Sequence, residues 1–321
     1  MMEKGLVSLI TPCYNTATLV HRLLDSVLAQ DYPKLEMIAV DDGSTDNTAE
    51  VLESYRTRFE SRSIPLTILK QKNSGQSFAI NRALKLVKGE FLVWPDSDDF
   101  YNRPDAVSQM VRAFRQLSND YGMIKMLPKY VDEKGLKDIT RNCVIDKSER
   151  QFEQALFDNS FPWGFYAIYV KALDAVNPQR EIYTEKKAGQ NWQMVLPVLY
   201  SYKCYTLEEN VFSVLSRRNS HSRPTDRSIL PQLERIEVYE RTILNTLDRI
   251  SEMPLKERDN YKRAIRLKYA RQKLYVSCSF ADKERARKYK KDIIDNGGLL
   301  SLKELARDIL LRLNLYPFSK R

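Results

Sequence analysis

Short apolar segments alternate with amphipathic segments along residues 5–100 of the chain, and this alternation restricts the fold more than any other feature. The apolar segments are 6–10, 35–40, 66–69 and 91–94. Nearly all their positions are apolar, which is typical of strands that are buried on both faces of a parallel sheet. Between them, apolar residues recur three and four positions apart, as in a helix. This order predicts an α/β, Rossmann-like fold in which a mostly parallel sheet is flanked by helices.

Polar residues follow each of the four predicted strands at the point where the strand ends. They form the turns 11–15, 41–44, 73–75 and 96–99. In an open α/β sheet, ligands bind outside the carboxyl ends of the strands. We therefore expect the four turns to lie at one edge of the sheet and to form a binding site.

The last of these turns, Asp96-Ser97-Asp98-Asp99, places three carboxylates within four residues. Such groups repel one another unless the turn is well solvated or a hard divalent cation neutralises them. A cation held by one or two carboxylates, and otherwise by diphosphate oxygens and water, suits Mg²⁺ or Mn²⁺. A solvated acidic turn that caps a helix is the alternative, but the position after the fourth strand favours a site.

A second acidic turn begins with Asp41 and Asp42 at the end of the second strand. A carboxylate at this place could accept a hydrogen bond from a base N–H or a ribose hydroxyl. The alternative is an Asx turn followed by a helix cap at Asp46.

The four segments 7–15 (VSLITPCYN), 39–46 (AVDDGSTD), 73–75 (NSG) and 94–99 (WPDSDD) together resemble those of the family-2 glycosyltransferases. The resemblance covers approximately residues 5–220 and implies an inverting enzyme with a GT-A fold. It also implies a nucleotide-sugar donor, most often UDP-linked, and a Mn²⁺ or Mg²⁺ cofactor. The acceptor would be a saccharide or a lipid-linked saccharide in polysaccharide or glycolipid synthesis. We expect a GT-A domain at residues 1–225 and a basic helical region at residues 226–321.

The resemblance also assigns roles to single residues. It implies that Thr11, Pro12 and Tyr14 line the nucleotide base pocket, that Asp42 binds the base and that Asp98 binds the cation. The full set implied for donor binding is Thr11, Pro12, Tyr14, Asn15, Asp41, Asp42, Asn73, Gly75, Asp96 and Ser97.

The proton-accepting residue is where the sequence departs from the family. Many members carry a Glu-Asp pair at the start of a helix, but this chain has Gln190-Asn191, and an amide is no general base near neutral pH. The candidate bases are Glu181 and Glu185, just upstream of this pair, and Asp99, and we favour Glu185. Gln190, Asn191 and Trp192 are then expected to shape the acceptor pocket.

One histidine and three arginines fall in the polar segment 216–223, which the family often places near the diphosphate. His221 is a candidate metal ligand, and Arg217 or Arg218 could bind phosphate. The alternative is an exposed basic loop.

The positive charge of the chain is concentrated near its C-terminus. Residues 256–321 contain 19 Lys and Arg against 8 Asp and Glu, a net charge of +11, whereas the whole chain carries +10. The final stretch also predicts an amphipathic helix with leucines amid basic residues. Such a helix could bind an anionic membrane surface, pack against the catalytic domain or pack against a second protomer. We see no nucleic-acid recognition motif.

Other observations limit the class of protein. There is no run of 18 apolar residues and no signal-peptide pattern, and the four cysteines are widely scattered. We therefore expect a cytoplasmic protein, peripheral at most on the inner face of the plasma membrane. The first turn lacks the Gly-rich loops of nucleotidyltransferases and of dinucleotide-binding dehydrogenases. A scaffold that binds nucleotide-sugar without turnover stays open because of Asn191.

Overall fold

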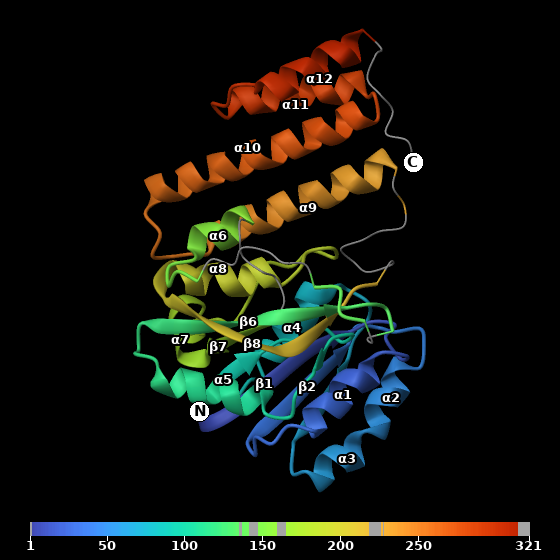
Figure 1. Cartoon of the computed structure of the whole chain (residues 1–321), viewed down its shortest axis with the longest axis vertical. Coiled ribbons are helices and arrows are strands. Elements are labelled where there is room, and N and C mark those ends of the chain that lie inside the picture. The colour runs from blue at the N-terminus through green and yellow to red at the C-terminus, as the bar shows by residue number, and fades with distance from the viewer. Residues whose placement is uncertain are drawn as a thin grey trace. The chain divides into compact units, whose positions relative to one another are not determined.

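The structure is a computed structural model that describes residues 2–134, 137–140, 147–158, 165–217, 226 and 228–313. The chain divides into two compact units, Met1–Arg223 and Pro224–Arg321. Figure 1 shows strands and helices in the first unit and helices in the second.

An eight-stranded sheet in the order β3-β2-β1-β4-β7-β6-β8-β5 forms the centre of the first unit. The strands are β1 (Glu3–Cys13), β2 (Leu35–Asp41), β3 (Leu66–Lys70), β4 (Gly89–Val93), β5 (Phe100–Tyr101), β6 (Tyr121–Val131), β7 (Phe165–Tyr169) and β8 (Lys203–Leu215). Strands β1 to β4 are parallel, and so is the β6–β8 pair. Strand β7 is antiparallel to β4 and β6, and β5 is antiparallel to β8. The predicted α/β fold is confirmed, with its all-parallel part confined to the first four strands.

Eight helices accompany these strands in the described part of the first unit. They are α1 (Val20–Leu28), α2 (Thr48–Ser54), α3 (Arg56–Ser61), α4 (Gln76–Leu84), α5 (Ala106–Gln116), α6 (Phe152–Phe157), α7 (Val170–Val176) and α8 (Asn191–Ser201). Helix α1 buries the apolar face that its sequence spacing predicts, as Leu23 and Val27 illustrate, and α5 likewise buries one face, which includes Met110.

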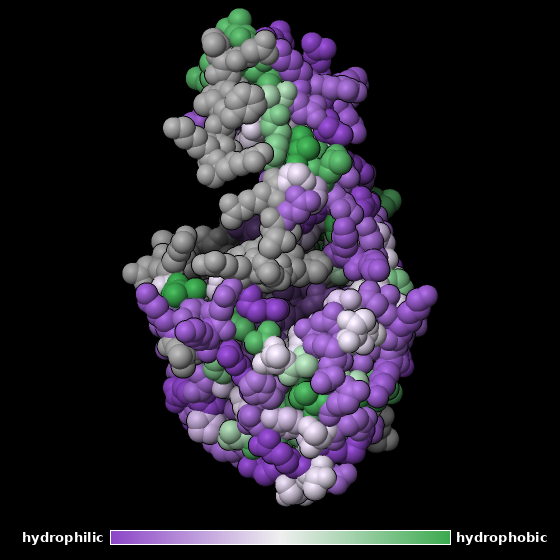
Figure 2. Space-filling model, turned by 90° about the vertical axis from the view of Figure 1, so that its right-hand side faces the viewer, coloured by the Kyte–Doolittle hydropathy of each residue, from purple (hydrophilic) through white to green (hydrophobic). Residues whose placement is uncertain are grey.

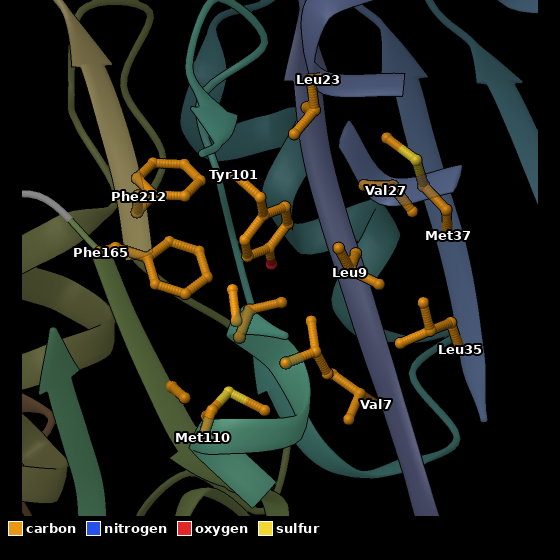
Figure 3. Packing of buried hydrophobic residues seen from close by; sticks show 14 of the residues in the cluster. Val7, Leu9, Leu23, Val27, Leu35, Met37, Tyr101, Met110, Phe165 and Phe212 are labelled. Atoms are coloured by element: carbon orange, nitrogen blue, oxygen red, sulfur yellow. The ribbon is translucent and has the colours of Figure 1, made fainter. Parts of the chain in front are cut away.

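A cluster of buried apolar side chains lies between the sheet and helices α1, α2, α3 and α5. Val7 and Leu9 of β1, Met37 of β2 and Val27 of α1 all belong to this cluster, and Val27 lies beside Met37 (Figure 3). Near the other end of the sheet, the rings of Phe165 and Phe212 stack 4.2 Å apart, and Tyr101 meets both edge-on. Because the packed core fixes the strands, the turns at their carboxyl ends are held on a rigid edge.

The first strand is longer than the sequence predicts. We expected it to end at Thr11-Pro12, but β1 pairs with β2 as far as Cys13 and Asp41. The other neighbour, β4, pairs with β1 only as far as Leu9. Pro12 therefore lies where the strand has a single partner, and there its missing N–H is tolerated.

Four helices form the described part of the second unit, as the sequence predicts. They are α9 (Ile229–Asp248), α10 (Leu255–Ser279), α11 (Lys283–Asp295) and α12 (Leu302–Arg312). Asp282 caps α11 by accepting the N–H of Arg285, and Ser301 and Glu304 form a capping box at the start of α12. Among the described residues, no helix is both long and apolar enough to cross a bilayer.

Candidate active site

Hydrogen bonds join the first two polar turns at the sheet edge. The side-chain oxygen of Asn15 accepts the backbone N–H of Thr45 at 2.8 Å, and the N–H of Asn15 donates to the hydroxyl of Ser44 at 3.0 Å. Asn15 adopts a left-handed backbone conformation with φ of 50°, which asparagine tolerates better than most residues. The loops that follow β1 and β2 are therefore held together as one unit.

The three residues expected to line the base pocket differ in their access to a ligand. Thr11 and Pro12 are buried within β1, whereas the side chain of Tyr14 is 48% exposed. The Thr11 hydroxyl is buried, and no partner is recorded for it in the described part of the chain. Tyr14 is thus the member of this predicted group whose ring is accessible to a ligand.

Asp42 is the buried anchor of the third turn. One oxygen of its carboxylate accepts the side-chain amide of Gln71 at 2.7 Å and the N–H of Ser74 at 2.8 Å, and the other accepts the N–H of Gly75 at 2.8 Å. Its neighbour Asp41, equally buried, accepts one side-chain hydrogen bond, from the N–H of Ser44 at 3.0 Å. The sequence did not indicate that Asp42 organises this loop.

Two glycines allow the turns to approach one another. Gly43 and Gly75 both have positive φ, of 71° and 107°. A β-carbon on Gly43 would lie 2.5 Å from the backbone nitrogen of Asn73, and one on Gly75 would lie 2.3 Å from the carbonyl oxygen of Lys186. Only glycine fits such contacts, so the turn after β3 lies directly against the turn after β2 and the segment before α8.

Asp96 lies between two glutamine side chains from distant parts of the sequence. The amides of Gln76, at the start of α4, and Gln190, just before α8, each donate to the same oxygen of Asp96 at 3.1 Å. Burial and the charge of Asp98 raise the pKa of Asp96 to about 6. Sequence reasoning missed Gln76, although its position directly after the third polar turn was a usable signal.

The other two carboxylates of the turn have different partners. Asp98 forms an ion pair with Arg217, with 2.5 Å between a carboxylate oxygen and a guanidinium nitrogen. Asp99 is buried and accepts the N–H of Leu215, the last residue of β8, at 2.9 Å. Its pKa is raised well above the usual range by burial and by the charges of Asp98 and Asp96. Asp99 therefore ties β8 to the acidic turn.

The carboxamides at the start of α8 contact the end of β4. The indole N–H of Trp94, the residue after β4, donates to the side-chain oxygen of Asn191 at 3.0 Å. Gln190 is buried, and its side-chain oxygen has no recorded partner among the described residues. Trp192 is half-buried on the first turn of α8. Of the three predicted acceptor residues, Gln190 thus contacts Asp96, and Asn191 contacts Trp94 just before the fourth polar turn.

Glu185 is positioned from the start of α4. The hydroxyl of Ser77 donates to the carbonyl of Glu185 at 3.1 Å and accepts its N–H at 3.3 Å. The hydroxyl of Tyr183 donates to the Glu185 carboxylate at 3.0 Å. The side chain is partly exposed, unlike that of Asp99.

The carboxylates of the fourth turn fit a hard cation that also binds phosphate oxygens. In the part of the chain that the structure describes, no group of three His, Cys, Asp or Glu side chains is arranged to hold a metal. Burial, and next the charges of neighbouring carboxylates, raise the pKa values of Asp96 and Asp99, and a divalent cation would relieve the repulsion between these carboxylates. Mg²⁺ and Mn²⁺ need few protein carboxylates when phosphate oxygens and water complete the shell. His221 lies outside the described residues.

Comparison with known proteins gives a family match and several relatives. The sequence profile of Glycosyl transferase family 2 matches residues 8–175. An uncharacterised glycosyltransferase of Rickettsia felis is 35% identical over 132 residues, which are 40% of this chain and 21% of that protein. The putative teichuronic acid biosynthesis glycosyltransferase TuaG of Bacillus subtilis is 37% identical over 107 residues, 33% of this chain and 41% of TuaG.

The poly(ribitol-phosphate) β-N-acetylglucosaminyltransferase TarS of Staphylococcus aureus is 34% identical over 121 residues, 37% of this chain and 20% of TarS. The matched segments thus span between a fifth and two-fifths of the length of these curated relatives.

Solved structures resemble the whole chain. Residues 1–349 of S. aureus TarS, in complex with UDP-GlcNAc, match with a TM-score of 0.61 at 18% identity, over 96% of this chain and 92% of that one. The mannosyltransferase PcManGT of Pyrobaculum calidifontis, in complex with GDP-Man and Mn²⁺, matches with a TM-score of 0.54 at 18% identity, over 97% and 80%. The fold is therefore the GT-A fold with a C-terminal helical region.

Proposed function

Since the chain belongs to glycosyl transferase family 2, we propose that it transfers a sugar from a nucleotide-sugar, UDP-linked, to an acceptor hydroxyl with inversion. The transferred group is a hexosyl or N-acetylhexosaminyl unit, and the product is a polysaccharide or a glycolipid. One observation carries this proposal: the turns after β1 to β4 form one hydrogen-bonded edge that presents Tyr14, Asp42 and Asp98 together with Arg217.

The nucleoside binds at the first three turns in this proposal. Tyr14 offers an accessible ring for stacking against the base. A carboxylate accepts about four hydrogen bonds, and Asp42 already accepts three. Its remaining acceptor position is available for a base N–H. The loop that Asp42 anchors, with Asn73 and Gly75, then borders the nucleoside.

The diphosphate binds at the fourth turn, between Asp98 and Arg217. A bound Mn²⁺ or Mg²⁺ would supply positive charge to stabilise the departing nucleoside diphosphate. Arg217 already lies against Asp98, and its guanidinium can bind a phosphate oxygen as readily as a carboxylate. Asp96, fixed by Gln76 and Gln190, stands next to the ribose and orients that part of the donor.

The acceptor hydroxyl loses its proton to Glu185 in this proposal. Asp99 is less suited to this task because its carboxylate is buried and accepts the N–H of Leu215. Glu185 is partly exposed, and Tyr183 and Ser77 hold it in place. Gln190, Asn191 and Trp192 border the acceptor on the α8 side.

The central experiment measures Mn²⁺-dependent binding and hydrolysis of a panel of nucleotide-sugars. Asp98→Asn should reduce turnover by at least about a hundredfold, because a neutral amide would hold the cation that stabilises the leaving group much less well. Asp120→Asn is the matched control, because Asp120 is an exposed aspartate that pairs with Lys203 at the opposite end of β8. If no nucleotide-sugar binds, or if both variants behave alike, the proposed activity is wrong.

A second experiment separates the enzyme from a non-catalytic scaffold, the alternative that the Gln190-Asn191 pair favours. Glu185→Gln should abolish sugar transfer while leaving donor affinity unchanged. Glu181→Gln tests the other nearby glutamate, which pairs with Lys85, and this variant should keep sugar transfer. A wild-type protein that binds donor tightly but transfers nothing to any offered saccharide supports the scaffold.

A further inference from the structure

Helix α12 packs against the rest of the helical unit with its charged face. Glu304 pairs with Arg271 of α10, and Asp308 pairs with Lys290 of α11 at 2.5 Å. Both members of the second pair are nearly buried. Leu311 is the one leucine of α12 that is buried with them. The inner face of this helix is therefore mainly ionic.

The outer face of α12 is apolar. Helical spacing places Leu302, Leu305, Ile309 and Leu313 on one side, opposite Asp308 and Leu311. All four are exposed, Leu302 by 84% and Ile309 by 56%. Figure 2 shows hydrophobic residues among hydrophilic ones on the surface of the helical unit. This arrangement reverses that of an ordinary surface helix, whose apolar stripe faces the core.

Basic residues border this apolar face. At 3.6 residues per turn, Lys303 lies at one edge of the face and Arg312 at the other. The Arg312 side chain is 69% exposed although it pairs with Asp308. The surrounding sequence strengthens this charge, because residues 256–321 carry a net charge of +11 while the remainder is nearly neutral. A leucine face with cationic edges is complementary to a surface that is apolar beneath an anionic layer.

The size of the face decides between a lipid surface and a second copy of the chain. With 11 residues, α12 presents a face about 16 Å long and about 10 Å wide. A stable protein dimer buries about 800 Å² on each partner, far more than this face offers. Insertion into a bilayer interface needs only a short row of apolar side chains and basic residues at headgroup level. A bilayer is therefore the better occupant.

We infer that the outer face of α12 docks on an anionic phospholipid bilayer, with Leu302, Leu305, Ile309 and Leu313 in the acyl boundary and Lys303 and Arg312 at the phosphates. The helix lies in the plane of the interface and does not cross the bilayer. This inference is independent of the proposed transferase activity.

Vesicle co-sedimentation of the full chain tests this docking. The chain should bind vesicles of phosphatidylcholine mixed with phosphatidylglycerol, and bind pure phosphatidylcholine at least about tenfold more weakly. Leu302→Ser with Ile309→Ser should lower the partition coefficient on mixed vesicles at least about tenfold. Lys303→Gln with Arg312→Gln should lower the same partition coefficient and make it much less dependent on salt concentration. Leu255→Ser is the matched control, because Leu255 is an equally accessible leucine of the same unit, 74% exposed.

Two further measurements distinguish a loss of lipid docking from unfolding and from dimer formation. Thermal unfolding followed by circular dichroism should stay close to wild type in the α12 variants, since the replaced side chains are exposed and an ion pair made by an exposed arginine, such as that of Arg312 with Asp308, contributes little to stability. Analytical ultracentrifugation without vesicles should show a monomer. Docking on lipid is refuted if wild-type protein and α12 variants bind mixed vesicles equally, or if the Leu255 variant loses as much binding. A wild-type dimer that the leucine variant dissociates would assign the face to a second copy instead.

Discussion

Replacing Asp42 by asparagine separates an anchoring role from a purely ligand-binding role. The Asp42 carboxylate is buried and accepts hydrogen bonds from Gln71, Ser74 and Gly75. An asparagine with its oxygen toward Gln71 and Ser74 keeps two of these bonds. Its amide nitrogen then faces the N–H of Gly75, so that two donors meet and the third bond is lost.

The magnitude follows from the strength of these bonds. A hydrogen bond to a charged group contributes about 1.5–3 kcal/mol, and the two that remain weaken when the acceptor becomes neutral. We expect Asp42→Asn to lower the free energy of unfolding of the first unit by about 2–4 kcal/mol. Asp41→Asn is the matched control, because Asp41 is equally buried but its side chain accepts one hydrogen bond, from the backbone N–H of Ser44, which asparagine can keep. Its expected cost is at most about 1 kcal/mol.

Urea unfolding followed by tryptophan fluorescence measures this difference in the first unit alone. All three tryptophans, Trp94, Trp163 and Trp192, belong to it. With an m-value of about 3 kcal/mol per molar urea, a loss of 3 kcal/mol lowers the midpoint by about 1 M. The Asp41 variant should shift it by less than about 0.3 M. If Asp42→Asn keeps the wild-type midpoint and loses only donor affinity, the anchoring role is refuted.

Three other changes test separate parts of the structure. Gly75→Ala should lower the free energy of unfolding by at least about 2 kcal/mol in the same urea assay, because its β-carbon would meet the Lys186 carbonyl; a neutral effect would contradict this packing. Asn191→Asp keeps the acceptor for the Trp94 indole, so stability should change by less than about 1 kcal/mol. Its turnover in a transfer assay should change less than tenfold, whereas a hundredfold gain would argue against Glu185 as the base. Glu90 has a pKa below its usual range because hydrogen bonds from an arginine and a backbone N–H outweigh its burial. The ionised Glu90 therefore adds to the free energy of unfolding above its unfolded pKa, and this stabilisation is lost as the pH falls. The difference in urea midpoint between wild type and Glu90→Gln should accordingly shrink from about pH 5 to about pH 3.

The sequence alone determined the elements and their order in the first unit. Continuous apolar segments and helical spacing depend on neighbouring residues, so β1 to β4 and their helices could be read directly. The polar turns at their carboxyl ends followed from the parallel arrangement. The length of β1 could not be read this way, because it depends on how far β2 and β4 extend beside Pro12.

Only the tertiary structure decided what the polar side chains contact. Asp96 meets Gln190 across 94 positions of sequence, and Asp99 meets Leu215 across 116. Such contacts depend on strand order and packing, which no local pattern records. The same holds for α12: its sequence reveals an apolar face and a charged face, but either could turn inward. Ion pairs with Arg271 and Lys290 hold the charged face inside, and the leucines remain exposed for that reason.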